Sequence, residues 1–334
     1  MSSTSPAVPT TVLCGFLGAG KTTLLSRLLA QPDGVRFGVL VNDFGEINID
    51  AGLIESAGAD SVSLANGCIC CSIQDDLVQA ALRILEGEPQ HLIVEASGVS
   101  RPLAILAALE GPALAGRLRV DSVICVADAD QFHSLDYAST ELAIDQAVCA
   151  DLLLVNKCDL ASADQIALLE STLRAPMPGL RMVRTSYAQV PRELLIGPTL
   201  GRQGAAVPHD GRRPAAAHEH DHRHEHEHQH EHEHSHNHDD EFVSWSFSTD
   251  QVIDEHRFDA VARELPASLL RAKAILRLRV DGREQRAVFH LVGKRQTLSV
   301  ESGPLPTLSQ FVVIARAGNL DVAALEQQMQ ALQA

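Results

Sequence analysis

The sequence has 334 residues, enough for more than one domain, and its 45% hydrophobic and 21% charged residues are ordinary for a globular protein. The formal net charge of −16 argues against a general nucleic-acid-binding protein, because phosphate contacts need a basic face. No apolar run approaches the roughly 18 residues that span a membrane, and the opening MSSTSPAVPT lacks the features of a signal peptide. We therefore expect a cytoplasmic protein with reduced thiols that binds neither nucleic acid nor membrane.

Short apolar runs alternate with amphipathic segments over residues 11–196, which follow a flexible N-terminus at 1–10. The runs are nearly continuous in Val, Ile and Leu, as in parallel strands that are buried on both faces. The expected strands are 11–14, 37–42, 61–66, 91–96, 121–128, 151–157 and 181–186, and the expected helices are 22–30, 75–87, 102–111 and 162–175. This alternation predicts an α/β domain with a doubly wound, mostly parallel sheet.

The pattern changes after residue 196. Residues 197–241 are first rich in Gly, Pro, Arg and Gln and then carry histidine at every second position, which predicts a disordered linker. Residues 242–334 predict a second, smaller α+β domain with a mostly antiparallel sheet. Its expected strands are 242–248, 275–280, 286–292, 296–300 and 310–316, and its expected helices are 256–272 and 319–333.

The first chemical motif is GFLGAGKT, residues 15–22, which matches the phosphate-loop pattern G-x-x-x-x-G-K-[ST] between an expected strand and an expected helix. Its glycines let backbone N–H groups face phosphates, and Lys21 would reach the β- and γ-phosphates while Thr22 binds Mg²⁺. The alternative is a plain strand–turn–helix loop. The candidate nucleotide-binding residues here are Gly15, Gly18, Ala19, Gly20, Lys21, Thr22 and Thr23.

NKCD, residues 156–159, closes a later expected strand. An Asn-Lys-x-Asp motif at this place would bind guanine, because the Asp159 carboxylate can accept from two guanine N–H donors that adenine does not match. The stem of Lys157 would cover the base, and Asn156 completes the motif. The alternative is an ordinary loop with a helix N-cap at Asp159 or Ser162.

Two acidic segments end other expected strands. Glu95, in HLIVEASG, is placed like a Walker-B carboxylate, so we take it as a Mg²⁺ residue with Thr22 and as a catalytic residue with Lys21. Gly98 would donate its N–H to the γ-phosphate. NDFGE, residues 42–46, would be a switch segment near the phosphates, with a bland acidic turn as the alternative.

NGCICCS, residues 66–72, places Cys68, Cys70 and Cys71 after another strand end. Three thiolates and one further ligand make a tetrahedral Zn²⁺ site, although thiolates also suit Cu(I) and small thiols also pack in cores. The histidine run would capture divalent metals as neutral imidazoles, or serve only as a spacer. Its members are His218, His220, His222, His224, His226, His228, His230, His232, His234, His236 and His238.

The motifs GFLGAGKTTLL, NDFGE, GCICC, EASG and NKCD, in that order, resemble the CobW family of metal-handling P-loop GTPases, relatives of the urease and hydrogenase nickel-insertion GTPases. LPASLLRAKAILRL and HLVGKRQTLS resemble that family's C-terminal domain. The resemblance implies a Mg-dependent GTPase that delivers a divalent metal, often Zn²⁺, to client metalloproteins. It also implies that Cys68, Cys70 and Cys71 bind the metal with Glu46 as a neighbour, and that Ser72 lies near the nucleotide.

The sequence departs from the family pattern at three positions. Asp43 stands where Glu is usual, and Ala274 and Arg277 stand where Gly and Trp are common. No residue is marked as orienting the attacking water, so we expect slow intrinsic turnover. Three other functions remain open: a cobalt chaperone for cobalamin synthesis, a nucleotide-modulated metal buffer, and a P-loop kinase or ATPase. Co²⁺ or Ni²⁺ could replace Zn²⁺, and the protein could be a monomer or a homodimer.

Overall fold

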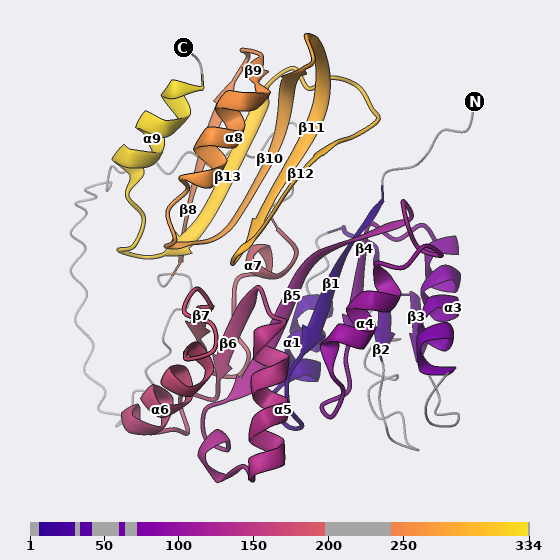
Figure 1. The fold of residues 1–334 in the computed structure, drawn as a ribbon, viewed down its shortest axis with the longest axis vertical. Coiled ribbons are helices and arrows are strands. Elements are labelled where there is room, and N and C mark those ends of the chain that lie inside the picture. Colours follow the sequence, from indigo (N-terminus) through magenta and orange to yellow (C-terminus); the bar gives the residue numbers. More distant parts are fainter. Residues whose placement is uncertain (1–6, 31–33, 42–59, 64–71, 198–241, 333–334) are drawn as a thin grey trace, which may run out of the picture.

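The computed structural model describes residues 7–30, 34–41, 60–63, 72–197 and 242–332. These residues form a seven-stranded sheet from the N-terminal part of the chain and a six-stranded sheet from the C-terminal part (Figure 1). Among them, no helix is both long and apolar enough to cross a membrane. The predicted fold class, a doubly wound parallel sheet followed by a smaller α+β domain, is confirmed.

The seven-stranded sheet is parallel at every pairing and has the order β3-β2-β4-β1-β5-β6-β7. Its strands are β1 (Val8–Cys14), β2 (Phe37–Val41), β3 (Asp60–Ser63), β4 (His91–Glu95), β5 (Leu118–Asp128), β6 (Leu152–Asn156) and β7 (Arg181–Arg184). Because all strands run the same way, the loops that follow them meet at one edge, which we call the carboxyl edge.

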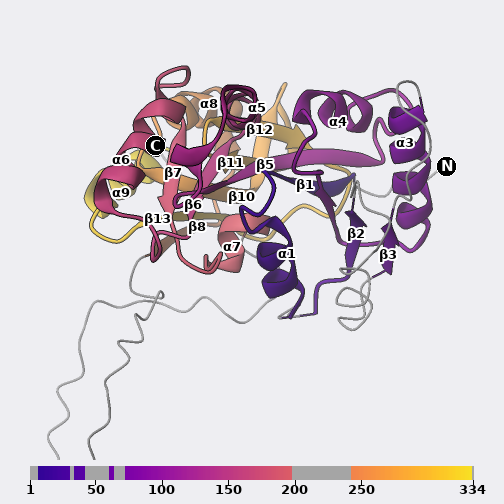
Figure 2. The same cartoon turned by 90° about the horizontal axis from the view of Figure 1, so that it is seen from below.

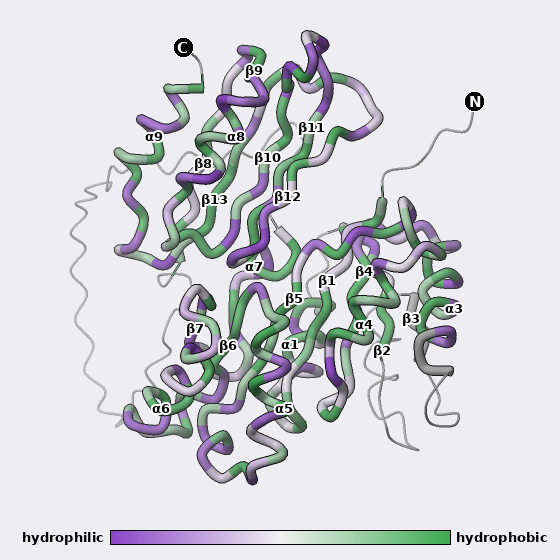
Figure 3. Tube along the Cα trace, in the orientation of Figure 1, coloured by the Kyte–Doolittle hydropathy of each residue, from purple (hydrophilic) through white to green (hydrophobic). Residues whose placement is uncertain are grey.

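Helices cover both faces of this sheet (Figure 2). α3, α4, α5 and α6 pack on one face, and α1 and α7 pack on the other. The helices are α1 (Lys21–Ala30), α3 (Ser72–Glu86), α4 (Pro102–Leu109), α5 (Tyr137–Val148), α6 (Ala163–Arg174) and α7 (Arg192–Ile196), with a short 3₁₀ turn η1 (Phe132–Ser134). Hydrophobic residues line the central strands, as Figure 3 shows. Neither α5 nor α7 was expected from the sequence.

The C-terminal domain has the strand order β12-β11-β10-β13-β8, with β9 paired to β10. α8 and α9 cover one face of its sheet, where Phe258 and Met329 pack against Phe289 and Phe311. The elements are β8 (Phe242–Thr249), β9 (Ile253–Asp254), α8 (Glu255–Arg263), β10 (Leu269–Val280), β11 (Arg283–Val292), β12 (Arg295–Val300), β13 (Ser309–Arg316) and α9 (Val322–Ala331).

One expected helix was wrong in its second half. Residues 256–272 were expected to be helical throughout, but α8 ends at Arg263 and β10 begins at Leu269. Pro266 lies between them and cannot donate a helical hydrogen bond. The residues after it gain two strand neighbours, because β10 pairs with both β11 and β13. Tertiary pairing therefore overrides the helix propensity of Leu, Arg and Ala at this point.

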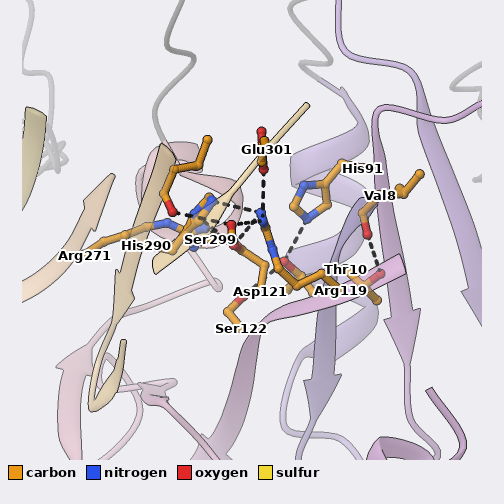
Figure 4. Close-up of polar contacts among 12 residues, drawn as sticks. Val8, Thr10, His91, Arg119, Asp121, Ser122, Arg271, His290, Ser299 and Glu301 are labelled. Atoms are coloured by element: carbon orange, nitrogen blue, oxygen red, sulfur yellow. Dashed lines mark hydrogen bonds and ion pairs between the residues drawn. The ribbon is translucent and has the colours of Figure 1, made fainter. Parts of the chain in front are cut away.

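A buried ion pair joins the two domains in the amino-terminal half of the seven-stranded sheet (Figure 4). Arg271 of β10 has no exposed surface and pairs with Asp121 of β5, which is 4% exposed. The guanidinium also donates to the carbonyl oxygens of Leu194 and Leu195 in α7, at 2.9 and 2.8 Å. Neither charge can be left alone in the interior, so this pair fixes how the domains meet.

Two more side chains complete this cluster, and we call Asp121, Arg271, His290 and Arg119 the interdomain network. His290 Nδ1 lies 3.0 Å from Asp121 Oδ1, and Arg119 Nη2 lies 2.8 Å from His290 Nε2. Arginine can only donate, so the imidazole accepts at Nε2 and carries its proton on Nδ1, facing Asp121. Burial opposes ionisation of Asp121, yet Arg271 and His290 outweigh it and hold the pKa of that carboxyl well below its usual range.

The turn between β11 and β12 makes a second contact with the first domain. Arg295, the first residue of β12, donates from Nε to Asp151 Oδ2 at 2.9 Å. Asp151 lies just before β6 begins. Gly293 in this turn has a φ of +52°, and a Cβ added there would lie 1.5 Å from the Asp151 carbonyl oxygen. Only glycine fits at such an approach.

Candidate functional site

The phosphate loop lies between β1 and α1 at the carboxyl edge. Gly15 has a φ of +135°, and a Cβ there would lie 2.1 Å from the Val126 carbonyl oxygen of β5, so the loop passes too close to the sheet for a side chain. Lys21, the first residue of α1, is 7% exposed. Its ammonium donates to the carbonyl oxygens of Gly15 at 2.9 Å and of Phe16 at 3.1 Å. The lysine is thus folded back over the loop at the helix N-terminus.

Thr22 and Glu95 come together beside this loop. Thr22 Oγ1 donates to Glu95 Oε1 at 2.7 Å, which joins the start of α1 to the end of β4. Glu95 is 4% exposed. A hydroxyl and a carboxylate in contact are hard oxygen ligands of the kind that Mg²⁺ prefers, so these two residues fit that ion.

Asn156 ties the NKCD motif to the phosphate loop. Its amide Nδ2 donates to the Ala19 carbonyl oxygen at 2.8 Å, and its Oδ1 accepts from the Ala188 N–H at 2.8 Å. A Cβ at Gly20 would lie 2.5 Å from Asn156 Nδ2, so the asparagine packs directly on the loop. The segment around Ala188, which follows β7, was not singled out in the sequence. Only the strand order, which sets β6 beside β7, brings it here.

Lys157 and Asp159 of NKCD differ in exposure. Lys157 has a φ of +60°, and its ammonium lies 2.6 Å from Asp128 Oδ2 at the end of β5. Asp159 is exposed. The helix N-cap of α6 is Ser162, whose hydroxyl accepts from the Gln165 N–H at 3.3 Å while Gln165 Oε1 accepts from the Ser162 N–H. Asp159 is therefore not needed as a cap, which removes one alternative interpretation of this residue.

Gln146 of α5 holds the segment that follows Glu95, and no pattern in the sequence pointed to this residue. This side chain has no exposed surface, and its Nε2 donates to the carbonyl oxygens of Gly98 at 3.1 Å and Ser100 at 3.0 Å. A Cβ at Gly98 would lie 2.7 Å from the Leu17 backbone nitrogen, so Gly98 packs against the phosphate loop. The structure thus brings EASG and the loop together, as it does the loop and NKCD.

Several predicted site residues lie outside the described residues: Glu46 in NDFGE, the three cysteines Cys68, Cys70 and Cys71, and the histidine run 218–238. Ser72 is the first residue of α3. Within the described ranges, no group of three or more His, Cys, Asp or Glu side chains could hold a metal ion.

The cysteines within the described residues pack against the hydrophobic core. Cys14 has no exposed surface and Cys125 is 2% exposed, on neighbouring positions of β1 and β5. A contact with Cys125, together with burial, raises the pKa of the Cys14 thiol well above its usual value. Burial also raises the pKa values of Cys149 and Cys158. Such thiols stay neutral and make poor metal ligands.

Comparisons with known proteins give matches over both domains. The family model described as "CobW/HypB/UreG, nucleotide-binding domain" matches residues 9–184, and the one described as "Cobalamin synthesis protein cobW C-terminal domain" matches residues 242–333. Among curated relatives, "Zinc chaperone CobW" of Sinorhizobium sp is 34% identical over 230 residues, 59% of this chain and 64% of that protein. "Zinc-regulated GTPase metalloprotein activator 1" of Dictyostelium discoideum is 31% identical over 242 residues, 61% of this chain and 51% of that protein.

The chain thus spans less than two thirds of the length of these relatives. Among solved structures, the zinc-bound YjiA GTPase from E. coli is similar at a TM-score of 0.43 and 22% identity, with 98% of this chain and 99% of that chain covered.

Proposed function

Since the chain belongs to the CobW/HypB/UreG family, we propose that it is a Mg-dependent GTPase that binds zinc and transfers it to client metalloproteins. One observation carries the nucleotide part. Asn156 of the guanine-recognition motif donates to the Ala19 carbonyl oxygen of the phosphate loop, across 137 residues of sequence. The two motifs therefore lie in contact, which supports a shared GTP-binding site.

The site would divide the nucleotide between three elements. The phosphate-loop amides and the N-terminus of α1 would hold the phosphates, and Lys21 would turn its ammonium from the loop carbonyls to the β- and γ-phosphates. Lys157 and Asp159 would bind the guanine ring. The contact of Gly98 with the phosphate loop supports a role for this glycine in sensing the γ-phosphate.

Thr22 and Glu95 would hold Mg²⁺, Glu95 through water, and the ion would neutralise charge on the phosphates. Their 2.7 Å contact at the phosphate loop supports this assignment. Glu95 is held at the end of β4 and Thr22 at the start of α1, so the sheet and helix fix the spacing of the pair.

Zinc is the cargo in this proposal. Relatives named "Zinc chaperone CobW" and "Zinc-regulated GTPase metalloprotein activator 1" favour zinc over Co²⁺ or Ni²⁺. We assign it to Cys68, Cys70 and Cys71, with Glu46 as a neighbour and the histidine run as an accessory capture segment. The raised pKa values of the described cysteines support this choice, because those thiols are poor ligands.

Hydrolysis is tested first. Purified protein should hydrolyse GTP in preference to ATP, and omission of Mg²⁺ should abolish the activity. We expect turnover on the order of 10⁻² s⁻¹ or slower, as for GTPases without a stimulating partner. A preference for ATP would instead support a kinase or ATPase and overturn the assignment of NKCD.

Metal transfer needs a separate test. Zn²⁺ and Co²⁺ are titrated in competition into protein that lacks residues 218–238, with and without Mg·GTP, and the Co²⁺–thiolate absorption band counts the cysteine ligands. We expect one tight, thiolate-rich site whose affinity depends on GTP and which Cys68→Ser destroys without loss of GTP binding. Loss of nearly all metal capacity on deletion of 218–238 would favour a metal buffer instead.

A further inference from the structure

Asp128 is a buried carboxylate at the carboxyl edge that the proposed site does not yet use. It is the last residue of β5 and is 8% exposed. Its Oδ1 accepts from the backbone N–H groups of Asp130 at 3.0 Å and Gln131 at 3.1 Å, which shapes the turn after the strand. Its Oδ2 accepts from the Lys157 ammonium at 2.6 Å. The two oxygens thus perform separate tasks, and only the second concerns the nucleotide site.

The Lys157 side chain must be held in one conformation if its stem is to cover the base. Its backbone is in the left-handed region, with a φ of +60°, and its side chain is 30% exposed. It directly follows Asn156, which is bonded to the phosphate loop, and the β5–β6 register sets Asp128 opposite Asn156. A lysine stem has several rotatable bonds, and fixing them costs conformational entropy.

We propose that Asp128 is a positioning residue for guanine-nucleotide binding. By holding the Lys157 ammonium in the protein, it fixes the lysine stem in one conformation, so less order has to be created when the base binds. The charge-assisted bond is short and its carboxylate is buried, which makes it stronger than a surface ion pair. This inference rests on the proposed function, because it takes NKCD as the site of the base.

The structure offers a clean test in Asp128→Asn. Asparagine keeps an oxygen for the N–H groups of Asp130 and Gln131 but removes the negative charge that holds Lys157. We expect the Kd values of GTP and GDP to rise by the same factor of about five to ten, because both nucleotides share the base. The kcat for GTP should stay within about twofold, since phosphate chemistry lies elsewhere, and binding of ATP should not change.

Lys157→Met supplies the second arm, because it keeps an apolar stem, removes the ammonium and leaves Asp128 with its two backbone bonds. If Asp128 acts through Lys157, this variant loses the same affinity for GTP, and the double variant Asp128→Asn/Lys157→Met loses no more. Asp130→Asn is the matched control: it makes the same charge change in the same turn, at a carboxylate that accepts from the Gln131 side chain and, among the described residues, does not bond Lys157. It should leave GTP affinity unchanged.

Other results would overturn the inference. Unchanged GTP affinity in Asp128→Asn or Lys157→Met, with wild-type protein binding GTP normally, would reduce Asp128 to a turn residue and leave the proposed function intact. Fully additive losses in the double variant would show that the two residues act separately. If Asp128→Asn does not fold, Lys157→Met still tests the inference, because it should raise the Kd of GTP and leave that of ATP unchanged. Absence of GTP binding in the wild type would overturn the proposed function itself.

Discussion

The two ends of the seven-stranded sheet both bury polar side chains, but with different partners. At the amino-terminal end, Asp121 meets Arg271 from the other domain, so the charges are matched within the protein. At the carboxyl edge, the Lys21 ammonium donates to carbonyl oxygens of the glycine-rich loop, and Asp159 is exposed. The first cluster pairs its charges within the protein, and the second is where we propose that the nucleotide binds.

This difference shows that a buried charge does not by itself mark a functional site. The interdomain network contains strongly perturbed groups, because burial lowers the pKa values of His290 and Arg271, while Arg271 holds the pKa of Asp121 well below its usual range. Perturbed pKa values often point to active sites, but ion pairs in domain interfaces produce them too. The predictions below separate the two ends, from the largest expected effect to the smallest.

Asp121→Ala should cause the largest change. Arg271 would keep its charge with no counterion in the interior, so the free energy of unfolding should fall by about 3–5 kcal/mol. Urea unfolding measures it. The exposed pair of Arg263 and Asp259, 3.2 Å apart, gives the control, because Asp259→Ala should cost less than about 0.5 kcal/mol. Equal costs for the two variants would show that the interdomain network does not stabilise the protein.

Lys21→Ala should lower the activity and leave the stability nearly unchanged. Without the ammonium, the charge that develops on the transferred phosphoryl group loses one stabilising partner, and kcat/KM for GTP should fall by about 10²–10³-fold. The melting temperature should change little, because the Lys21 ammonium donates to the carbonyl oxygens of Gly15 and Phe16 in its own loop. If Lys21→Ala instead lowered the melting temperature and kept its kcat/KM for GTP, the carboxyl edge would be structural and the contrast between the two ends of the sheet would be wrong.

Substitutions of Asp159 and Ser162 separate binding of the guanine base from capping of α6. Asp159→Ala should weaken GTP binding by about 10–100-fold, because the guanine N–H donors lose a charged acceptor, and should leave stability unchanged. Ser162→Ala removes the N-cap of α6 and should lower the free energy of unfolding by about 1 kcal/mol without changing GTP affinity. Calorimetric titration and thermal melts distinguish them. Similar effects from both variants would mean that the loop is only structural.

Near neutral pH the smallest effect is a pH dependence from His91, which lies beside Thr11 with its Nε2 at 2.9 Å from the hydroxyl. Burial lowers the pKa of His91 to about 3, with Asp121, Arg271, Lys273 and His290 as the charged or titratable groups that act on it. The unfolded chain takes up a proton near pH 6.5 and the folded one does not. The free energy of unfolding should therefore fall as the pH drops below 6.5, by up to about 1.4 kcal/mol per unit for this residue.

His91→Gln provides the comparison, because an amide can still bond Thr11 but does not titrate. Denaturation at pH 7, 6 and 5 should show a slope smaller by one proton than in the wild type. His290 keeps a share of the slope in the variant, because burial lowers its pKa as well. Parallel curves for the two proteins would mean that His91 takes up its proton at the same pH in the folded and the unfolded chain, so that burial does not lower its pKa.

The sequence predicted the sheet well, because each buried parallel strand is a local apolar run that needs no partner to be recognised. The phosphate loop is local in the same way. Asp128 and Gln146 were missed because their roles depend on contacts with Lys157 and Gly98, which are distant in the sequence. Arg271 was placed in a helix, so the interdomain network could not be foreseen from the sequence.

The metal-binding part of the site remains a prediction. Cys68, Cys70, Cys71 and Glu46 lie outside the described residues, so their place relative to Lys21 and Thr22 rests on sequence position alone. The domain boundaries drawn from composition are likewise expectations, although β8 begins at Phe242, where the second domain was expected to start.

The close approach of Gly293 to the Asp151 carbonyl sets a rule for recombining such proteins. A C-terminal half taken from another chain must bring glycine at the tip of its β11–β12 turn, together with an arginine that reaches Asp121. In a chimaera without the glycine, the β11–β12 turn would have to move away from Asp151. In one without the arginine, the Asp121 carboxylate would lose its partner Arg271. Two positions, Gly293 and Arg271, thus decide whether the halves are compatible.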